Sequence, residues 1–140
     1  MNPSLVNTNR KPDLTFAYTA ATRQTTVFLK ADNYILGSHT YTIQKNVAEP
    51  AKIGEVLKLW TDKISKGEYY NHAEYICYLP EGTISFVDNR SLVESQPFWL
   101  PNSTHMFPIC NPTGDFTFSK GYIIIKRDNA EGRECFVYFD

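Results

Sequence analysis

The sequence has no long apolar run and no excess of charge of one sign. Its 140 residues include 14 lysines and arginines against 15 aspartates and glutamates, which leaves a formal net charge of −1. General nucleic-acid binders need a basic face that neutralises phosphates, so we expect no nucleic-acid partner. No apolar run approaches the roughly 18 residues that a membrane helix needs, so we expect no membrane span.

Cysteine is scarce, and the first residues show no recognisable targeting signal. The three cysteines, Cys77, Cys110 and Cys135, are odd in number and show no CxxC spacing, which is typical of small buried thiols in a reducing compartment. Residues 1–13 are polar and lack the charged-then-apolar order of a secretory signal. We therefore expect a cytoplasmic protein with a flexible tail over residues 1–13 and a single domain over residues 14–140.

The common motifs of enzyme sites are absent as well. The sequence contains no GxGxxG, GxxxxGK[ST], HExxH or GxSxG. His39, His72 and His105 are scattered, and none is paired with another histidine or cysteine at ligand spacing, so we expect no metal site. A Cys–His nucleophile pair is disfavoured at Cys77 and Cys110, because apolar surroundings raise the pKa of a thiol.

The sequence is instead rich in aromatic and β-branched residues, which recur in short segments. Aromatic residues make up 14% of the chain. Strand-like segments lie at residues 14–19, 25–30, 38–43, 73–79, 83–87, 122–126 and 135–139. Turn-forming residues separate them at Gly37, Gly67, Pro80–Gly82, Pro112–Gly114 and Asp128–Gly132. Many short strands at close spacing predict a β-sandwich or a β-barrel.

Residues 49–65 allow two interpretations. Five apolar side chains recur at helix spacing, namely Ile53, Val56, Leu57, Trp60 and Ile64. That period favours an amphipathic helix. If residues 56–64 form a strand instead, Lys58, Trp60 and Asp62 share one of its faces.

Two stretches in the second half of the chain carry a family resemblance. The first is IGEVLKLWTDKI at residues 53–64, followed by Gly67 and by Tyr75-Ile76-Cys77-Tyr78. The second is PTGDFTFSKGYIII at residues 112–125, and a last strand-like segment follows at residues 135–139. Together, over residues 53–139, they resemble the barrel family of allene oxide cyclases and plant dirigent proteins, which includes bacterial spirotetronate cyclases.

The resemblance implies an all-β fold, an eight-stranded antiparallel up-and-down barrel with an interior cavity and little helix. Such a barrel can hold one small ligand, and it makes residues 56–64 a strand. Gly114 and Gly121 would then bracket a tight corner where φ is positive or a side chain would clash. By analogy with its relatives, the protein would form a homodimer or a homotrimer.

The resemblance also implies a set of site residues. Its cavity positions correspond to Trp60, Asp62 and Cys77, with aspartate standing where the family has asparagine. A buried carboxylate must be paired or protonated, which makes Asp62 the candidate catalytic residue, whereas a place at the hydrated rim would make it a plain surface charge. The candidate substrate-binding residues are Lys58, Trp60, Tyr75, Cys77 and Trp99. Of these, Trp99 belongs to an apolar run that could cover the pocket or simply pack.

The activity that the resemblance implies is a cofactor-free cyclase or isomerase. It would bind a small hydrophobic, lipid-like or polyketide-like molecule and direct a ring closure by holding the reacting carbons close together. The glutamate that allene oxide cyclases use has no counterpart near Leu29, so the substrate is expected to differ. Two other functions stay open: a non-catalytic binding protein for a small hydrophobic ligand, and a structural or interaction barrel whose interior is filled by side chains.

Overall fold

The computed structural model describes residues 10–65, 68–92 and 99–140, and nearly all of its regular structure is β-strand. The described strands are β1 (Leu14–Thr19), β2 (Gln24–Lys30), β3 (Tyr34–Asn46), β4 (Glu49–Ser65), β5 (Glu68–Leu79), β6 (Gly82–Leu92), β7 (Thr104–Pro108), β8 (Gly121–Arg127) and β9 (Gly132–Phe139). Two single-turn 3₁₀ helices complete the regular structure, η2 (Ala20–Thr22) and η3 (Gly114–Phe116).

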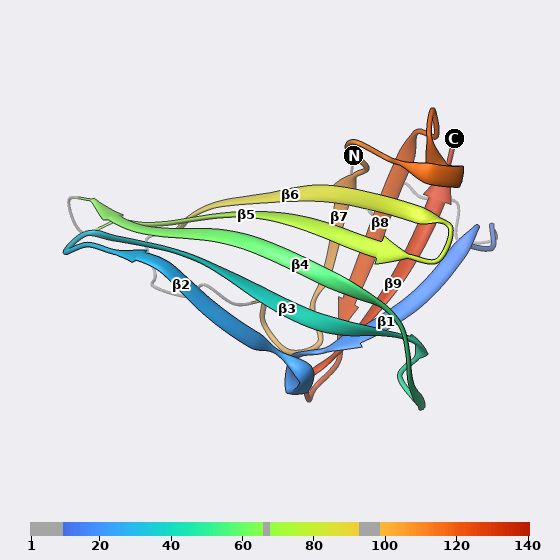
Figure 1. The fold of residues 1–140 in the computed structure, drawn as a ribbon, viewed down its shortest axis with the longest axis horizontal. Coiled ribbons are helices and arrows are strands. Elements are labelled where there is room, and N and C mark those ends of the chain that lie inside the picture. The colour runs from blue at the N-terminus through green and yellow to red at the C-terminus, as the bar shows by residue number, and fades with distance from the viewer. Residues whose placement is uncertain (1–9, 66–67, 93–98) are drawn as a thin grey trace.

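The strands form one antiparallel sheet that curls into a barrel, as predicted (Figure 1). Their order is β6-β5-β4-β3-β1-β9-β8-β7, and β2 pairs with β3 outside this row. The two ends of the row meet at an isolated bridge between Ser85 in β6 and Cys110 after β7. Near-complete closure satisfies the backbone groups that an open sheet edge would expose.

The first two strands together make one interrupted strand. Both lie along the same side of β3, because Tyr18 pairs with Ile43 while Gln24 pairs with Thr40. The break falls at η2, where the Thr19 hydroxyl accepts a hydrogen bond of 3.2 Å from the amide of Ala21. Counted in this way, the described sheet has the eight-stranded layout that was expected. Only the β1 half pairs with β9, so β2 continues along β3 with no described strand on its other edge.

Residues 49–65 form the 17-residue strand β4, which confirms the strand interpretation and excludes the helix. β4 pairs along its length with β3 on one side and β5 on the other. Its side chains alternate in burial: Val56 and Lys58 point inward and are buried, whereas Leu59 is exposed. Pairing on both edges outweighs the local helical period, because secondary-structure propensity is a weak preference that tertiary context overrides.

The core fills the closed part of the barrel with the inward side chains of successive strands. Its centre is a column of stacked rings in which Tyr75 lies 4.5 Å from Phe86, and Phe86 lies 4.8 Å from Phe107, measured between ring centroids. Trp99 packs against this column, and its indole Nε1 donates a 2.9 Å hydrogen bond to the buried carboxylate of Asp88. The apolar run that contains Trp99 thus enters the core at this residue, while residues 93–98 lie outside the described part of the chain.

The glycines confirm one turn prediction and correct another. Gly114 and Gly121 adopt φ values of 63° and 152°, as expected for the corner between β7 and β8. A Cβ on Gly121 would lie 2.0 Å from the carbonyl oxygen of Tyr138, so no larger residue fits there. Gly37, which was predicted to mark a turn, lies inside β3 instead. The short strand β7 was not predicted at all.

The predicted flexible tail falls mostly on residues 1–9, which lie outside the described residues. The part that is described, residues 10–13, is attached to β9: the Asp13 amide donates a 2.8 Å hydrogen bond to the carbonyl of Val137. Arg10 and Asp13 form an ion pair at 2.7 Å. Within the described residues, no helix is long and apolar enough to cross a membrane.

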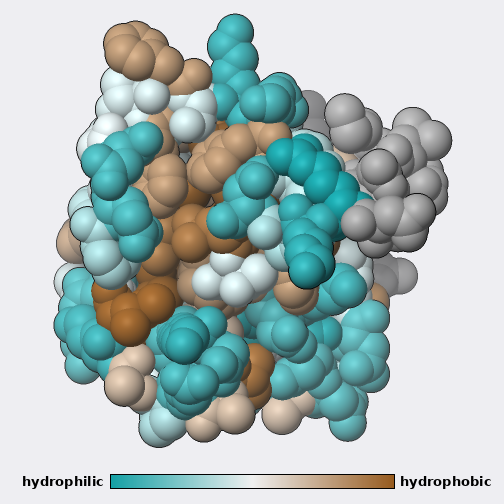
Figure 2. Space-filling model, turned by 90° about the vertical axis from the view of Figure 1, so that its right-hand side faces the viewer, coloured by the Kyte–Doolittle hydropathy of each residue, from teal (hydrophilic) through white to brown (hydrophobic). Residues whose placement is uncertain are grey.

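Figure 2 shows the end of the molecule that carries the β5–β6 turn and the C-terminus. Hydrophobic side chains gather in the middle of this face, and hydrophilic side chains surround them. The candidate site lies toward the opposite end, where β2, β3, β4 and β5 extend past the closed part of the barrel (Figure 1).

Candidate functional site

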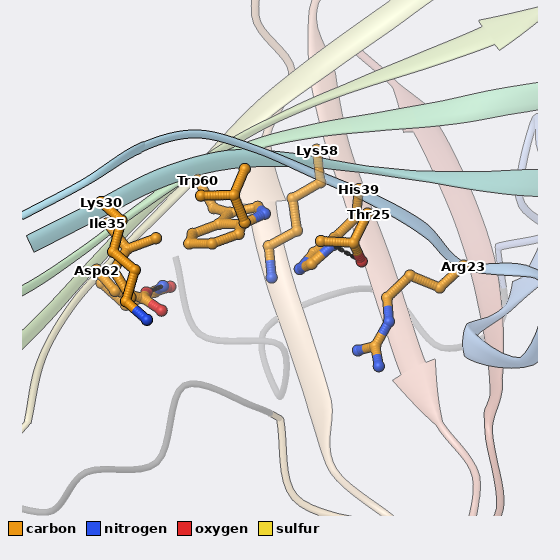
Figure 3. A pocket seen from close by; sticks show the side chains of 10 residues that line it. Arg23, Thr25, Lys30, Ile35, His39, Lys58, Trp60 and Asp62 are labelled. Atoms are coloured by element: carbon orange, nitrogen blue, oxygen red, sulfur yellow. Dashed lines mark hydrogen bonds between the residues drawn. The ribbon is translucent and has the colours of Figure 1, made fainter.

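A pocket of about 390 Å³ lies on the inner face of the extended strands β2–β5 (Figure 3). The residues that line it are Arg23, Thr25, Val27, Lys30, Ile35, His39, Lys58, Trp60, Asp62 and Asn71. Sites for small molecules typically have volumes of about 300–1,000 Å³. The described part of the barrel therefore has room for a ligand at this end, beside a core that side chains fill.

Strand pairing brings the lining residues together. His39 on β3 lies directly opposite Lys58 on β4, and Asp62 on β4 lies opposite Asn71 on β5. Because side chains alternate between the two faces of a strand, Lys58, Trp60 and Asp62 all face inward. The pocket is thus built from every second residue of neighbouring strands.

Trp60 owes its position to a glycine. Gly37 is its direct neighbour across the β3–β4 pair, and a Cβ on Gly37 would lie 2.5 Å from the Trp60 ring. The missing side chain leaves room for the indole to lie across β3. The imidazole of His39 stacks on the indole with ring centroids 5.1 Å apart and an angle of 27° between the planes. Both rings belong to the lining, so one side of the pocket is aromatic.

His39 is held in place by its neighbours and kept neutral by them. Its Nδ1 lies 2.8 Å from the Thr25 hydroxyl, and its other ring nitrogen faces the pocket (Figure 3). Burial lowers the pKa of His39 to about 4, and the positive charges of Lys58 and Arg23 act in the same direction, against the carboxylate of Asp62. At neutral pH this imidazole therefore carries no charge and can accept or donate a hydrogen bond.

The carboxylate of Asp62 is hydrogen-bonded to the amide nitrogen of Asn71. An ionised carboxylate only accepts hydrogen bonds, so the NH₂ group of Asn71 must face it and the carbonyl Oδ1 must point away. That oxygen is buried and has no partner among the described residues. The indole Nε1 of Trp60 is likewise buried and has no partner among the described residues. Unpaired buried polar atoms cost about 1–3 kcal/mol each, and here one acceptor and one donor belong to residues that line the same pocket.

Lys58 carries its charge deep in the pocket. Its side chain is 8% exposed, and its ammonium lies 5.4 Å from the centroid of the Tyr75 ring, which belongs to the core. A cation over an aromatic face is stabilised by the ring quadrupole. Lys58 thus connects the polar pocket to the aromatic core beneath it.

The structure brings three of the six predicted site residues into one pocket: Lys58, Trp60 and Asp62. The other three, Tyr75, Cys77 and Trp99, are buried in the core and are not among the residues that line this pocket. Burial raises the pKa of the Cys77 thiol to about 12, so at neutral pH it stays protonated and inert.

Sequence reasoning missed seven of the ten residues that line the pocket. Arg23, Thr25 and Lys30 come from the β1–β2 region, where the family resemblance identified strands only. His39 was considered only as a metal ligand, and no group of three or more metal-ligating side chains occurs among the described residues. Asn71 lies just before a predicted strand that began at residue 73. No local signal marks these residues, because only the β2–β3–β4–β5 register places them beside Lys58 and Asp62.

Comparison with known proteins bears on the fold alone. No protein-family model matches the sequence. A search of curated proteins finds no significant match either. Among solved structures, the barrel is similar to that of a pyocyanin demethylase, with a TM-score of 0.57 and 15% sequence identity over 89% of this chain and 98% of the other. At that identity the similarity supports the β-barrel architecture, and the chemistry has to be argued from the pocket.

Proposed function

We propose that this protein is a cofactor-free isomerase or cyclase that acts on a small hydrophobic molecule in the pocket between β2 and β5. One observation carries the proposal: a carboxylate, an ammonium group and a neutral imidazole converge on a single pocket with an aromatic wall. Groups of this kind can move protons within a bound molecule. The resemblance of residues 53–139 to the allene oxide cyclase barrel favours the same class of chemistry.

The proposed mechanism gives a task to Asp62, Trp60 and Lys58. The Asp62 carboxylate accepts a proton from a carbon beside a carbonyl group of the substrate. The Trp60 N–H and the Lys58 ammonium stabilise the negative charge that develops on the carbonyl oxygen. Return of the proton to another carbon isomerises the molecule, whereas attack of the deprotonated carbon on an electrophilic carbon of the same molecule closes a ring. Isomerisation leaves the composition of the substrate unchanged. Ring closure does so too when the attacked part of the molecule takes up the proton.

The test is a comparison of the host's small-molecule extract before and after incubation with the protein, by chromatography with mass detection. We expect a compound whose retention changes while its mass does not. Asp62→Asn should abolish this change, because an amide cannot accept the proton. Asp115→Asn, at an exposed position in η3, is the matched control and should react at the wild-type rate.

Two outcomes would contradict the proposal. A compound that the protein retains unaltered would make it a binding barrel. Unchanged turnover by Asp62→Asn would remove the role given to the carboxylate. Circular dichroism of both variants shows whether a lost activity reflects lost chemistry or a lost fold.

A further inference from the structure

The described lining of the pocket has more cationic than anionic side chains, although the chain is nearly neutral overall. The whole sequence has a formal net charge of −1. The described lining, in contrast, contains the cationic side chains of Arg23, Lys30 and Lys58 against the single carboxylate of Asp62. The positive charge is therefore concentrated at this site.

The charged side chains of the lining act on His39, which lies among them. Arg23 lines the pocket, and its positive charge acts on His39. Lys58 lies opposite His39 on the neighbouring strand. Burial is the largest cause of the lowered pKa of His39, the charges of Lys58 and Arg23 lower it further, and the charge of Asp62 raises it. Asp62 is itself engaged by Asn71, as described above.

An aromatic wall borders the same pocket. The stacked rings of Trp60 and His39 belong to its lining, as the cations do (Figure 3). The buried indole N–H of Trp60 and the buried carbonyl oxygen of Asn71 have no partner among the described residues. Flat rings pack on such a wall, and an acidic group pairs with cations in a partly desolvated site more strongly than it does in water.

We infer that the ligand of this pocket is a compact molecule with a flat aromatic or conjugated ring and an acidic group such as a carboxylate. The ring lies against Trp60, and the acidic group lies toward Arg23 and Lys30. The inference rests on the proposed function only in taking this pocket as the substrate site. It narrows the class of expected ligands from hydrophobic molecules in general to organic anions.

Three probes of equal size separate the contribution of charge from that of the ring: 2-naphthoate, the neutral 2-naphthalenemethanol and the cationic 2-naphthylmethylamine. Binding is followed through the indole N–H signals of the two tryptophans in ¹⁵N-resolved NMR spectra. The Trp60 signal should move, because its Nε1 belongs to the pocket. The Trp99 signal should stay in place, because its Nε1 is bonded to Asp88 in the core. We expect 2-naphthoate to bind at least about tenfold more tightly than the alcohol, with an affinity that falls as salt is added.

Substitutions assign the preference to named cations. Arg23→Gln and Lys30→Gln alter exposed side chains, so the fold should be retained, and the double variant should lose about tenfold in affinity for 2-naphthoate. Lys58→Met removes the buried charge at nearly constant volume, and its fold is checked by circular dichroism. Lys45→Met, at an exposed position near the far end of the same strand as His39, is the matched control and should bind like the wild type.

The results separate this inference from the proposed function. Equal or tighter binding of the alcohol or the amine overturns the anion preference, as does a Trp60 signal that none of the three probes moves. Preference for 2-naphthoate without any conversion in the extract contradicts catalysis and leaves the anion site standing. If the protein converts a neutral compound and shows no preference for 2-naphthoate, the anion site is contradicted and the proposed catalysis stands.

Discussion

The two tryptophans of this chain have opposite surroundings, and each explains one property of the protein. Trp99 is buried, stacks on the ring column and donates its N–H to Asp88. Trp60 lies in the pocket wall, and its N–H has no partner within the described residues. Trp99 therefore stabilises the fold, whereas Trp60 lines the pocket and has a buried donor that no described residue satisfies.

This difference predicts unequal effects of the same substitution. Trp99→Phe removes a buried donor from Asp88 and leaves a gap in the core, so the free energy of unfolding should fall by about 2–4 kcal/mol. Trp60→Phe should lower it by about 1 kcal/mol or less, because no hydrogen bond is lost, and should weaken 2-naphthoate binding instead. Urea unfolding of both variants measures the difference. Equal losses of stability would contradict the assignment of the two roles.

His39 predicts a dependence of stability on pH. Its pKa is lowered from 6.5 to about 4 in the folded protein, so between these values the unfolded chain binds more protons than the folded one. The free energy of unfolding should therefore fall as the pH drops from 6.5 toward 4. The contribution of the neutral His39 side chain to that free energy is fully present above pH 6.5.

The measurement compares wild type and His39→Gln by urea unfolding at pH 7, 5.5 and 4, with an NMR titration of the imidazole. The variant should lose less stability than the wild type over this range. His72→Gln, at an exposed position on β5, is the matched control. A titration midpoint of His39 near 6.5 would contradict the prediction.

At the scale of the elements, the pocket depends on the contact between β3 and β4. Gly37 and Trp60 face each other across these strands, and the absent side chain of one makes room for the large side chain of the other. Aromatic residues commonly cover a glycine on a neighbouring strand in this way. A glycine that resembles a turn signal in the sequence is thus part of the pocket wall.

Gly37→Ala should displace the indole. The new Cβ would lie 2.5 Å from the Trp60 ring and 2.7 Å from the carbonyl oxygen of Thr26, so the ring or β2 must shift. We expect a loss of about 1–3 kcal/mol in stability, a changed indole signal of Trp60 and weaker binding of 2-naphthoate. Thr40→Ala, further along β3 on its other face, should leave the Trp60 signal in place. An unchanged Trp60 signal in Gly37→Ala would contradict this account of the wall.

At the scale of the whole molecule, the barrel opens where the first strand is interrupted. Among the described strands, β1 pairs with β3 and β9, whereas β2 pairs only with β3, and all the residues of β2 are exposed. The same interruption frees the inner face of β2–β5 from the ring column. The opening of the barrel and the presence of the pocket thus have one cause.

This asymmetry predicts unequal protection of backbone amides. β4 is hydrogen-bonded on both sides, whereas β2 has one neighbour and few buried contacts, so it should open locally far more easily. Amides of β2 should exchange with deuterium about a hundredfold faster than those of β4 between residues 54 and 62. Slower exchange in β2 on addition of 2-naphthoate would place the ligand beside it. Equal protection of the two strands would contradict the open layout.

The sequence by itself determined most of the strands, through composition, turn chemistry and the alternation of side chains along a strand. The corner at Gly114 and Gly121 and the strand that places Lys58, Trp60 and Asp62 on one face were implied by the family resemblance, whereas the local period of residues 49–65 favoured a helix. The tertiary structure decided the rest. Only the register places Arg23 and His39 beside Lys58, only the long-range pairing of β4 excludes its helical period, and only packing buries Cys77 and Trp99 in the core. The physical reason is that strand pairing joins residues far apart in the chain, and no window of sequence records which strand will be the neighbour.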